Sequence, residues 1–140
     1  PDRMIQVLTN VLSNAIRFSP EGDAVVVNAH RNGSVLRVAV SDSGPGIAED
    51  FRDRVFEAFA RGEHEAWRHR SGSGLGMSIS RGIIEELGGA ISFETEIDEG
   101  TTFFIEIWPA LLVRFHCGGE QTPLVRCIIV RNRDFMNSAG

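Results

Sequence analysis

The sequence predicts an α/β fold, a two-layer α/β sandwich in which helices cover one face of a mixed, mostly antiparallel sheet. The 140 residues are 42% hydrophobic and 24% charged, which is typical of one globular domain. Two segments carry apolar residues at helical spacing, and four others alternate between apolar and polar residues. The alternating segments occur as two hairpin pairs, an order that favours antiparallel strands covered by helices.

The first half of the chain is expected to form a helix and a hairpin. Apolar residues recur at helical spacing over residues 3–18, and Ser19-Pro20-Glu21-Gly22 then breaks the helix. Residues 24–30 and 35–40 alternate as strands around the turn Arg31-Asn32-Gly33-Ser34.

The second half is expected to add two helices and a second hairpin. The acidic start of residues 48–56 suits the N-terminus of a short helix. Residues 60–73 are polar and without periodicity, which predicts a loop that acts as a lid. Helical spacing resumes over residues 75–87, and strands follow at residues 90–96 and 101–108.

The pattern changes after Pro109. Residues 110–140 carry a formal charge of +2, whereas residues 1–109 carry −7. Residues 111–113 and 127–130 are candidate edge strands, but the sequence does not place this tail in the fold. The abrupt beginning inside the start of a helix suggests a piece of a longer protein.

The composition disfavours several classes of function. A net charge of −5 argues against a nucleic-acid binder. No apolar run reaches the roughly 20 residues that span a bilayer, so we expect no membrane contact by this domain. The expected location is cytoplasmic, either free or as the cytosolic part of a membrane-bound sensor. Cys117 and Cys127 lack the spacing of a zinc site, and the absence of lysine excludes the motif GxxxxGK[ST].

Two glycine-rich turns point to a bound nucleotide. The first is Asp42-Ser-Gly-Pro-Gly-Ile47, and its carboxylate can accept a hydrogen bond from a base. The second is Gly72-Ser-Gly-Leu-Gly-Met77, which can offer backbone N–H groups to phosphates at the start of a helix. A polar stripe that includes Asn10, Asn14 and Arg17 lies on the first predicted helix, opposite its apolar face.

Together these motifs resemble the ATP-binding catalytic domain of sensor histidine kinases, within the group that also includes gyrase, the Hsp90 chaperones and MutL. The resemblance covers roughly residues 2–109 and rests on four motifs in the family's order. It implies a Bergerat-type fold, an ATP-binding catalytic domain at residues 1–109, and an unassigned tail at residues 110–140. It also implies ATP and Mg²⁺ as cofactors.

The segment Asn10-x-x-x-Asn14-Ala-x-Arg17-Phe18 resembles the family's N-box. The resemblance gives Asn14 the role of holding Mg²⁺ against the triphosphate, with Asn10 assisting. An amide oxygen suits this hard cation when phosphates and waters complete its coordination. Arg17 stands where many relatives have lysine, and its guanidinium can bond phosphate oxygens in a bidentate way. Asn10, Asn14 and Arg17 are thus the expected catalytic residues.

The other motifs complete the expected nucleotide site. Asp42 is the expected adenine acceptor. The F-box phenylalanines, Phe56 and Phe59, belong either to the lid or simply to the core. Arg68, His69 and Arg70 of the lid could meet the γ-phosphate or remain solvated. The residues expected to bind nucleotide are Asn10, Asn14, Arg17, Phe18, Asp42, Gly44, Gly46, Ile47, Arg61, Gly72, Gly74, Leu75, Gly76 and Thr102.

Asn10 favours a kinase over an ATPase. The ATPase relatives have a glutamate general base at this position, and asparagine cannot take a proton. None of the four histidines has the context of a phosphoacceptor, so the expected acceptor is a histidine on a separate dimerisation domain, with a response regulator downstream. An anti-sigma-factor-type serine kinase, a gyrase-like ATPase and a nucleotide-binding pseudokinase remain as alternatives.

Overall fold

The computed structural model describes residues 2–61, 72–108 and 126–131. The order of elements predicted from the sequence, helix, two strands, helix, helix, two strands, is confirmed, and one more strand follows. The elements are α1 (Asp2–Phe18), β1 (Ala24–Asn32), β2 (Val35–Asp42), α2 (Glu49–Arg52), α4 (Gly76–Glu86), β3 (Ala90–Glu96), β4 (Gly100–Ile107) and β5 (Arg126–Arg131).

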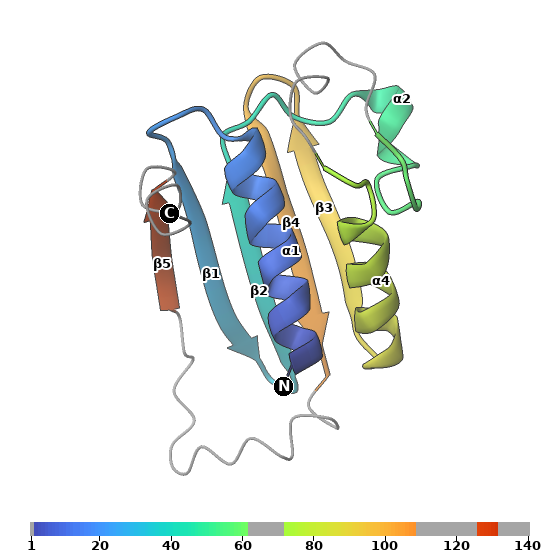
Figure 1. Cartoon of the computed structure of the whole chain (residues 1–140). Coiled ribbons are helices and arrows are strands. Elements are labelled where there is room, and N and C mark those ends of the chain that lie inside the picture. Colours follow the sequence, from blue (N-terminus) through green and yellow to red (C-terminus); the bar gives the residue numbers. More distant parts are fainter. Residues whose placement is uncertain (1, 62–71, 109–125, 132–140) are drawn as a thin grey trace.

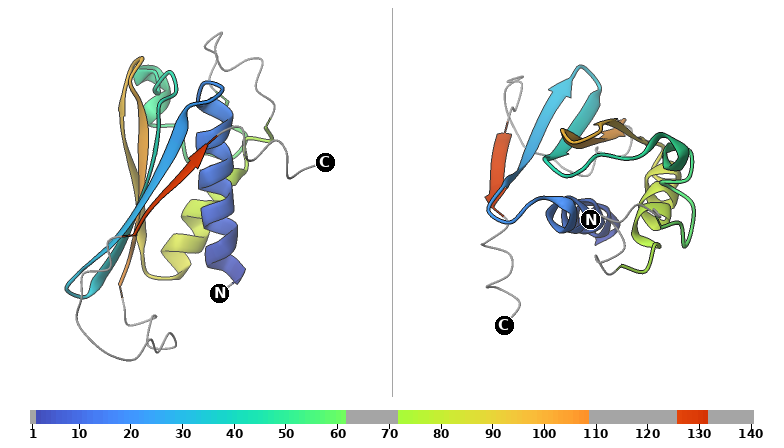
Figure 2. Two further views of the ribbon diagram at one scale, coloured as in Figure 1. Left: turned by 90° about the vertical axis from the view of Figure 1, so that its left-hand side faces the viewer. Right: turned by 90° about the horizontal axis from the view of Figure 1, so that it is seen from above.

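The described strands form a sheet in the order β3-β4-β2-β1-β5. Every pairing between neighbours is antiparallel, so the sheet contains no parallel pair among the described strands. Helices α1 and α4 lie side by side over one face of the sheet, and the two layers are seen edge-on in Figure 2. The two-layer α/β sandwich predicted from the sequence is therefore confirmed.

Strand β5 comes from the tail that the sequence did not place. It pairs with the outer edge of β1, with Ala24 opposite Arg131 and Ala29 opposite Arg126. One of the two candidate edge strands of the tail is thus present, while the other, residues 111–113, lies outside the described residues. Part of the tail belongs to the same sheet as the rest of the domain (Figure 1).

The core lies between the helices and the sheet. Val7, Val11 and Ala15 repeat along one face of α1 and are fully buried, as the helical spacing predicts. On β4, every second residue is buried, which places Phe103 and Ile105 under the helices. Phe56, Phe93 and Phe103 form an aromatic cluster with ring centroids 5.7–6.4 Å apart. These contacts fix the two layers against each other.

Two element boundaries differ from the prediction in ways that matter for the site. The short acidic helix α2 ends at Arg52, and turns rather than helix continue to residue 58. Strand β2 continues through Asp42, because Asp42 pairs with Thr101 at the start of β4. Among the described residues, no helix combines the length and the apolar character needed to cross a bilayer.

Candidate nucleotide-binding site

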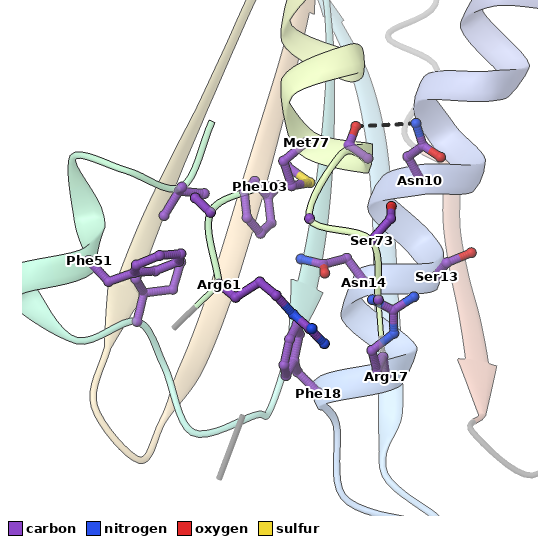
Figure 3. Close-up of a pocket in the computed structure, with 16 residues that line it drawn as sticks. Asn10, Ser13, Asn14, Arg17, Phe18, Phe51, Arg61, Ser73, Met77 and Phe103 are labelled. Atoms are coloured by element: carbon purple, nitrogen blue, oxygen red, sulfur yellow. Dashed lines mark hydrogen bonds between the residues drawn. The ribbon is translucent and has the colours of Figure 1, made fainter. Parts of the chain in front are cut away.

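A cavity of about 210 Å³ opens between α1, the α2 region and the glycine turn before α4 (Figure 3). The helix contributes its polar stripe, and the sheet contributes Phe103 as a floor. The described residues that line it are Asn10, Ser13, Asn14, Arg17, Phe18, Ile47, Phe51, Val55, Ala60, Arg61, Gly72, Ser73, Gly74, Gly76, Met77 and Phe103. None of these side chains carries a carboxylate.

A second, narrower cavity of about 10 Å³ adjoins the first. Asn14, Phe18, Ile47 and Phe103 line both cavities, so the two are neighbouring parts of one site. The smaller cavity adds Asp42, Pro45, Gly46 and Thr101. The site therefore has an end with a carboxylate and an end with amides and guanidinium groups.

Asp42 is held at the end of β2 by two backbone donors. Its Oδ1 accepts hydrogen bonds from the N–H of Gly44, at 2.9 Å, and from the N–H of Thr101, at 3.3 Å. Burial raises the pKa of the Asp42 carboxyl above its ordinary value, although these two hydrogen bonds act in the opposite direction. Because both backbone donors use Oδ1, Oδ2 is the oxygen that remains to accept a hydrogen bond from a ligand.

The threonines of β4 are arranged differently from the prediction. Thr102, predicted to approach the nucleotide, donates its hydroxyl hydrogen to Ser41 Oγ at 2.9 Å on the face of the sheet away from the helices. Thr101 is buried and lies in the smaller cavity beside Asp42. Successive side chains of a strand point to opposite faces, so a shift of one residue exchanges the two positions. The prediction for Thr102 does not fit this site, and Thr101 takes its place.

Thr95 of β3 connects these groups. Its Oγ1 accepts a hydrogen bond from the N–H of Ile47 at 2.8 Å and lies 2.9 Å from Thr101 Oγ1. It also donates to the carbonyl of Gly100 at 3.1 Å. The Thr95 hydroxyl group therefore connects the first glycine turn to the β3–β4 hairpin by hydrogen bonds. The sequence did not predict this contact.

The first glycine turn requires glycine for steric reasons. Gly46 has a φ of +76°, and a side chain there would collide with the backbone of Glu96. At Gly44, a Cβ atom would lie 2.8 Å from the carbonyl oxygen of Phe18. The turn thus packs directly against both the end of α1 and the β3–β4 hairpin.

The two asparagines of α1 occupy different places in the site. Asn14 lines both cavities, whereas Asn10 lines only the larger one. The amide nitrogen of Asn10 donates to the carbonyl of Gly76 at 3.2 Å and to Ser80 Oγ at 3.3 Å. The structure therefore joins the N-box helix to the start of α4.

Two arginines extend into the larger cavity (Figure 3). Arg17 comes from the last turn of α1, and Arg61 from the segment after α2. The guanidinium group of Arg17 lies so close to Gly72 that it would have to shift to admit a side chain at this glycine. The two predicted phosphate-binding elements, the helix stripe and the second glycine turn, thus meet at Arg17.

The second glycine turn is joined to the F-box. The N–H of Phe59 donates to the carbonyl of Gly74 at 2.9 Å, and Gly74 has a φ of +72°. The two F-box phenylalanines differ in environment, since Phe56 packs in the aromatic cluster while the Phe59 side chain is 72% exposed. Arg68, His69 and Arg70 lie outside the described residues.

A metal ion at this site would depend on amide and ligand oxygens. Among the described residues, no group of three or more His, Cys, Asp or Glu side chains could hold a metal. Asn14 offers an amide oxygen beside Arg17 and the second glycine turn, and a hard cation such as Mg²⁺ accepts such an oxygen together with phosphate oxygens and water. These residues fit a cation that enters with a phosphorylated ligand.

The chain belongs to the family of histidine kinase-, DNA gyrase B- and HSP90-like ATPases, whose model matches residues 1–111. It is 44% identical over 110 residues to the sensor histidine kinase AruS of Pseudomonas aeruginosa, covering 76% of this chain and 11% of AruS. It is 40% identical over 106 residues to the sensor protein SrrB of Staphylococcus aureus, covering 76% of this chain and 18% of SrrB. The chain thus spans less than a fifth of the length of these relatives.

Solved structures agree with this assignment. The mycobacterial sensor histidine kinase MprB is similar with a TM-score of 0.68 and 30% identity, over 76% of this chain and 72% of the solved one. The catalytic domain of histidine kinase ThkA is similar with a TM-score of 0.64 and 34% identity, over 76% of this chain and 67% of the solved one. Full-length ShkA in complex with AMPPNP is similar with a TM-score of 0.63 and 33% identity, over 75% of this chain and 21% of the solved one. The predicted resemblance to histidine kinase catalytic domains is confirmed.

Proposed function

We propose that this chain binds Mg-ATP and donates the γ-phosphate to a histidine on a separate phosphoacceptor and dimerisation domain, in a two-component signalling system. The observation that carries the proposal is the joined cavity, which has the Asp42 carboxylate in its smaller part, Arg17 and Arg61 in its larger part, and Asn14 lining both. This distribution of polar groups suits a nucleotide laid with its base on Asp42 and its phosphates along α1. The ATP analogue named with ShkA supports the same ligand.

At the base end, Oδ2 of Asp42 accepts a hydrogen bond from the adenine amino group. Guanine carries a carbonyl oxygen at that place, which would face the carboxylate without a proton between them, so Asp42 selects adenine. The smaller cavity, at about 10 Å³, is too small for a purine ring. We therefore expect the turns around Gly46 and Thr101 to separate when nucleotide enters.

At the phosphate end, Mg²⁺ would be held by Asn14 together with phosphate oxygens. Bound there, the ion neutralises charge that develops on the transferring phosphoryl group. Arg17 and Arg61 supply positive charge from opposite sides, and the N-terminus of α4 offers backbone N–H groups. The roles of these residues are positioning and charge stabilisation, which is what phosphoryl transfer requires.

The site is better suited to transfer than to hydrolysis. A general base must lie within hydrogen-bond reach of the attacking water, and no described residue of the larger cavity carries a carboxylate. Asn10, which lines the same cavity, carries a neutral carboxamide, and this group cannot take a proton from an attacking water. An external nucleophile, such as the imidazole of another domain, would then take the γ-phosphate.

His30, the one histidine among the described residues, does not compete for that role. His30 alternates along β1 with Val25, Val27 and Ala29, which pack toward the core, so it lies on the opposite face of the sheet from the cavity. His64, His69 and His116 lie outside the described residues. We propose that the acceptor is presented in trans and that a response regulator then receives the phosphoryl group.

The proposal is tested by nucleotide binding and then by transfer. We expect ATP with Mg²⁺ to raise the melting temperature, GTP to have a much smaller effect, and Asn14→Ala to remove the Mg²⁺ dependence. Radiolabelled ATP should then label the phosphoacceptor domain of the parent kinase when both proteins are present, in an acid-labile form. Indifference to every nucleotide would contradict the binding proposal. Acid-stable label on a serine would instead support the anti-sigma-factor type.

A further inference from the structure

The Asn10 side chain has a defined orientation in the site. The carbonyl oxygen of Gly76 can only accept a hydrogen bond, so the group of Asn10 that faces it at 3.2 Å must be the amide nitrogen (Figure 3). The same nitrogen lies 3.3 Å from Ser80 Oγ. The amide nitrogen is therefore directed at α4, and the amide oxygen is the polar atom left for a ligand.

Ser80 is placed to complete this arrangement. The residue is fully buried, and its hydroxyl donates to the carbonyl of Gly76 at 2.8 Å. With its single proton used in that bond, Ser80 Oγ can only accept from Asn10. The hydroxyl thus gives the amide nitrogen a second acceptor in a place where water does not reach.

We propose that Ser80 is a positioning residue for phosphate and metal binding, because its buried hydroxyl fixes the Asn10 amide with the oxygen available to the ligand. The inference rests on the proposed binding of Mg-ATP and adds a residue that does not line the cavity. Without the hydroxyl, the amide nitrogen loses one of its two acceptors and the Asn10 side chain gains rotational freedom. Gly76 alone still favours the same orientation, so the expected effect is partial.

Ser78 supplies a matched control on the same helix. Its hydroxyl donates to the carbonyl of Leu75 at 2.9 Å, and the side chain is partly buried. Like Ser80, it bonds a carbonyl of the glycine turn or helix start, but none of its described hydrogen bonds involves Asn10. Ser78→Ala and Ser80→Ala remove the same atom, so their difference isolates the contact with Asn10.

The test is calorimetric titration of Mg-ATP and of adenosine into the full chain. We expect Ser80→Ala to weaken Mg-ATP binding about three- to tenfold, the range for one lost hydrogen bond, and to leave adenosine binding unchanged. Ser78→Ala should change neither. In an Asn10→Ala background, Ser80→Ala should have no further effect, because the group that it positions is already absent.

Several outcomes would overturn the inference. Equal losses for adenosine and Mg-ATP, or a full loss in the Asn10→Ala background, would show that Ser80 acts only through packing. If Ser80→Ala melts before it can be titrated, Ser80→Cys keeps the volume with weaker hydrogen bonding, and wild-type affinity in that variant would also count against the role. A wild-type chain that fails to bind Mg-ATP would instead contradict the proposed function itself.

Discussion

The two ends of the site differ in how their polar groups are held. At the base end, Asp42, Thr101 and Thr95 are linked to one another and to backbone N–H groups by bonds of 2.8–3.3 Å. At the phosphate end, Arg17 and Arg61 reach into the cavity on long, solvent-exposed side chains. Under the proposed function, the groups that would recognise the base are fixed by hydrogen bonds within the folded sheet, whereas the arginines that would meet the phosphates stand on exposed side chains with many rotatable bonds.

The largest expected effect tests the rigidity of the base end. Gly100 has a φ of +125°, and a side chain there would collide with the carbonyl oxygen of Asp42. We expect Gly100→Ala to destabilise the domain by about 3 kcal/mol or more, from backbone strain and the clash together. Urea unfolding without nucleotide measures this effect.

Gly82→Ala is the control for that substitution. Gly82 lies within α4, and a Cβ atom there would meet nothing within 4 Å. Alanine should stabilise the helix by about 0.5–1 kcal/mol. If the two variants lost similar stability, the base end would be no more constrained than an open helix surface.

The second prediction separates base reading from folding. In Asp42→Asn, the amide oxygen can keep both bonds from Gly44 and Thr101, but the amide nitrogen then replaces Oδ2. A donor would face the adenine amino group, also a donor, so ATP affinity should fall about ten- to hundredfold. Calorimetric titration checks this. Unchanged ATP affinity would remove Asp42 from the base site.

The same variant should be more stable than the wild type without nucleotide. Burial raises the pKa of Asp42, so the folded state binds its proton more tightly than the unfolded state does. The contribution of protonated Asp42 to the stability of the fold is fully present below the pKa that this carboxyl has in the unfolded state. It is lost as pH rises through the pKa of the carboxyl in the folded state. We therefore expect the melting temperature of Asp42→Asn to exceed that of the wild type at neutral pH, with a smaller difference at about pH 4. If the two proteins differed in melting temperature by the same amount at both pH values, the raised pKa would not belong to Asp42.

The smallest effect concerns the phosphate end. Because Arg17 is exposed, Arg17→Ala should weaken Mg-ATP binding by only about fivefold, with a loss that shrinks as salt is added, and should leave adenosine binding unchanged. Arg54→Ala is the matched control, since Arg54 is also exposed and pairs with Glu57 at 3.3 Å. That variant should keep full affinity and change stability by less than about 0.5 kcal/mol. A salt-independent loss at Arg17 would indicate a rigid phosphate end as well.

Much of this arrangement could be predicted because it is encoded locally. Helical spacing in residues 3–18 placed Asn10, Asn14 and Arg17 on one helix face, and alternation defined four of the strands. The position of Thr102 away from both cavities also follows from the sequence, because Phe103, Ile105 and Ile107 alternate with it and mark the inward face of β4. By that alternation, Thr101 is the residue that points toward Asp42.

Other features depend on contacts between distant segments. The hydrogen bonds that Asn10 makes with Gly76 and Ser80 join residues 66 and 70 positions apart, and no periodicity in either helix signals them. Strand β5 pairs with β1 across about a hundred residues, and a short apolar run does not identify its partner. Such features follow from packing of the whole domain and become visible only in the folded chain.

The hydrogen bond from Phe59 to Gly74 has a consequence for how this family diversifies. The bond brings together the two ends of the segment between these residues, so the distance that the segment must bridge is set by the core and not by its own length. By loop-closure entropy, doubling the number of residues between two ends that are held together costs only about 0.6 kcal/mol. Insertions or deletions between residues 60 and 73 should therefore be tolerated by the fold. Relatives could then vary the length and charge of the sequence between Phe59 and Gly74 while keeping the cavity that the described residues form.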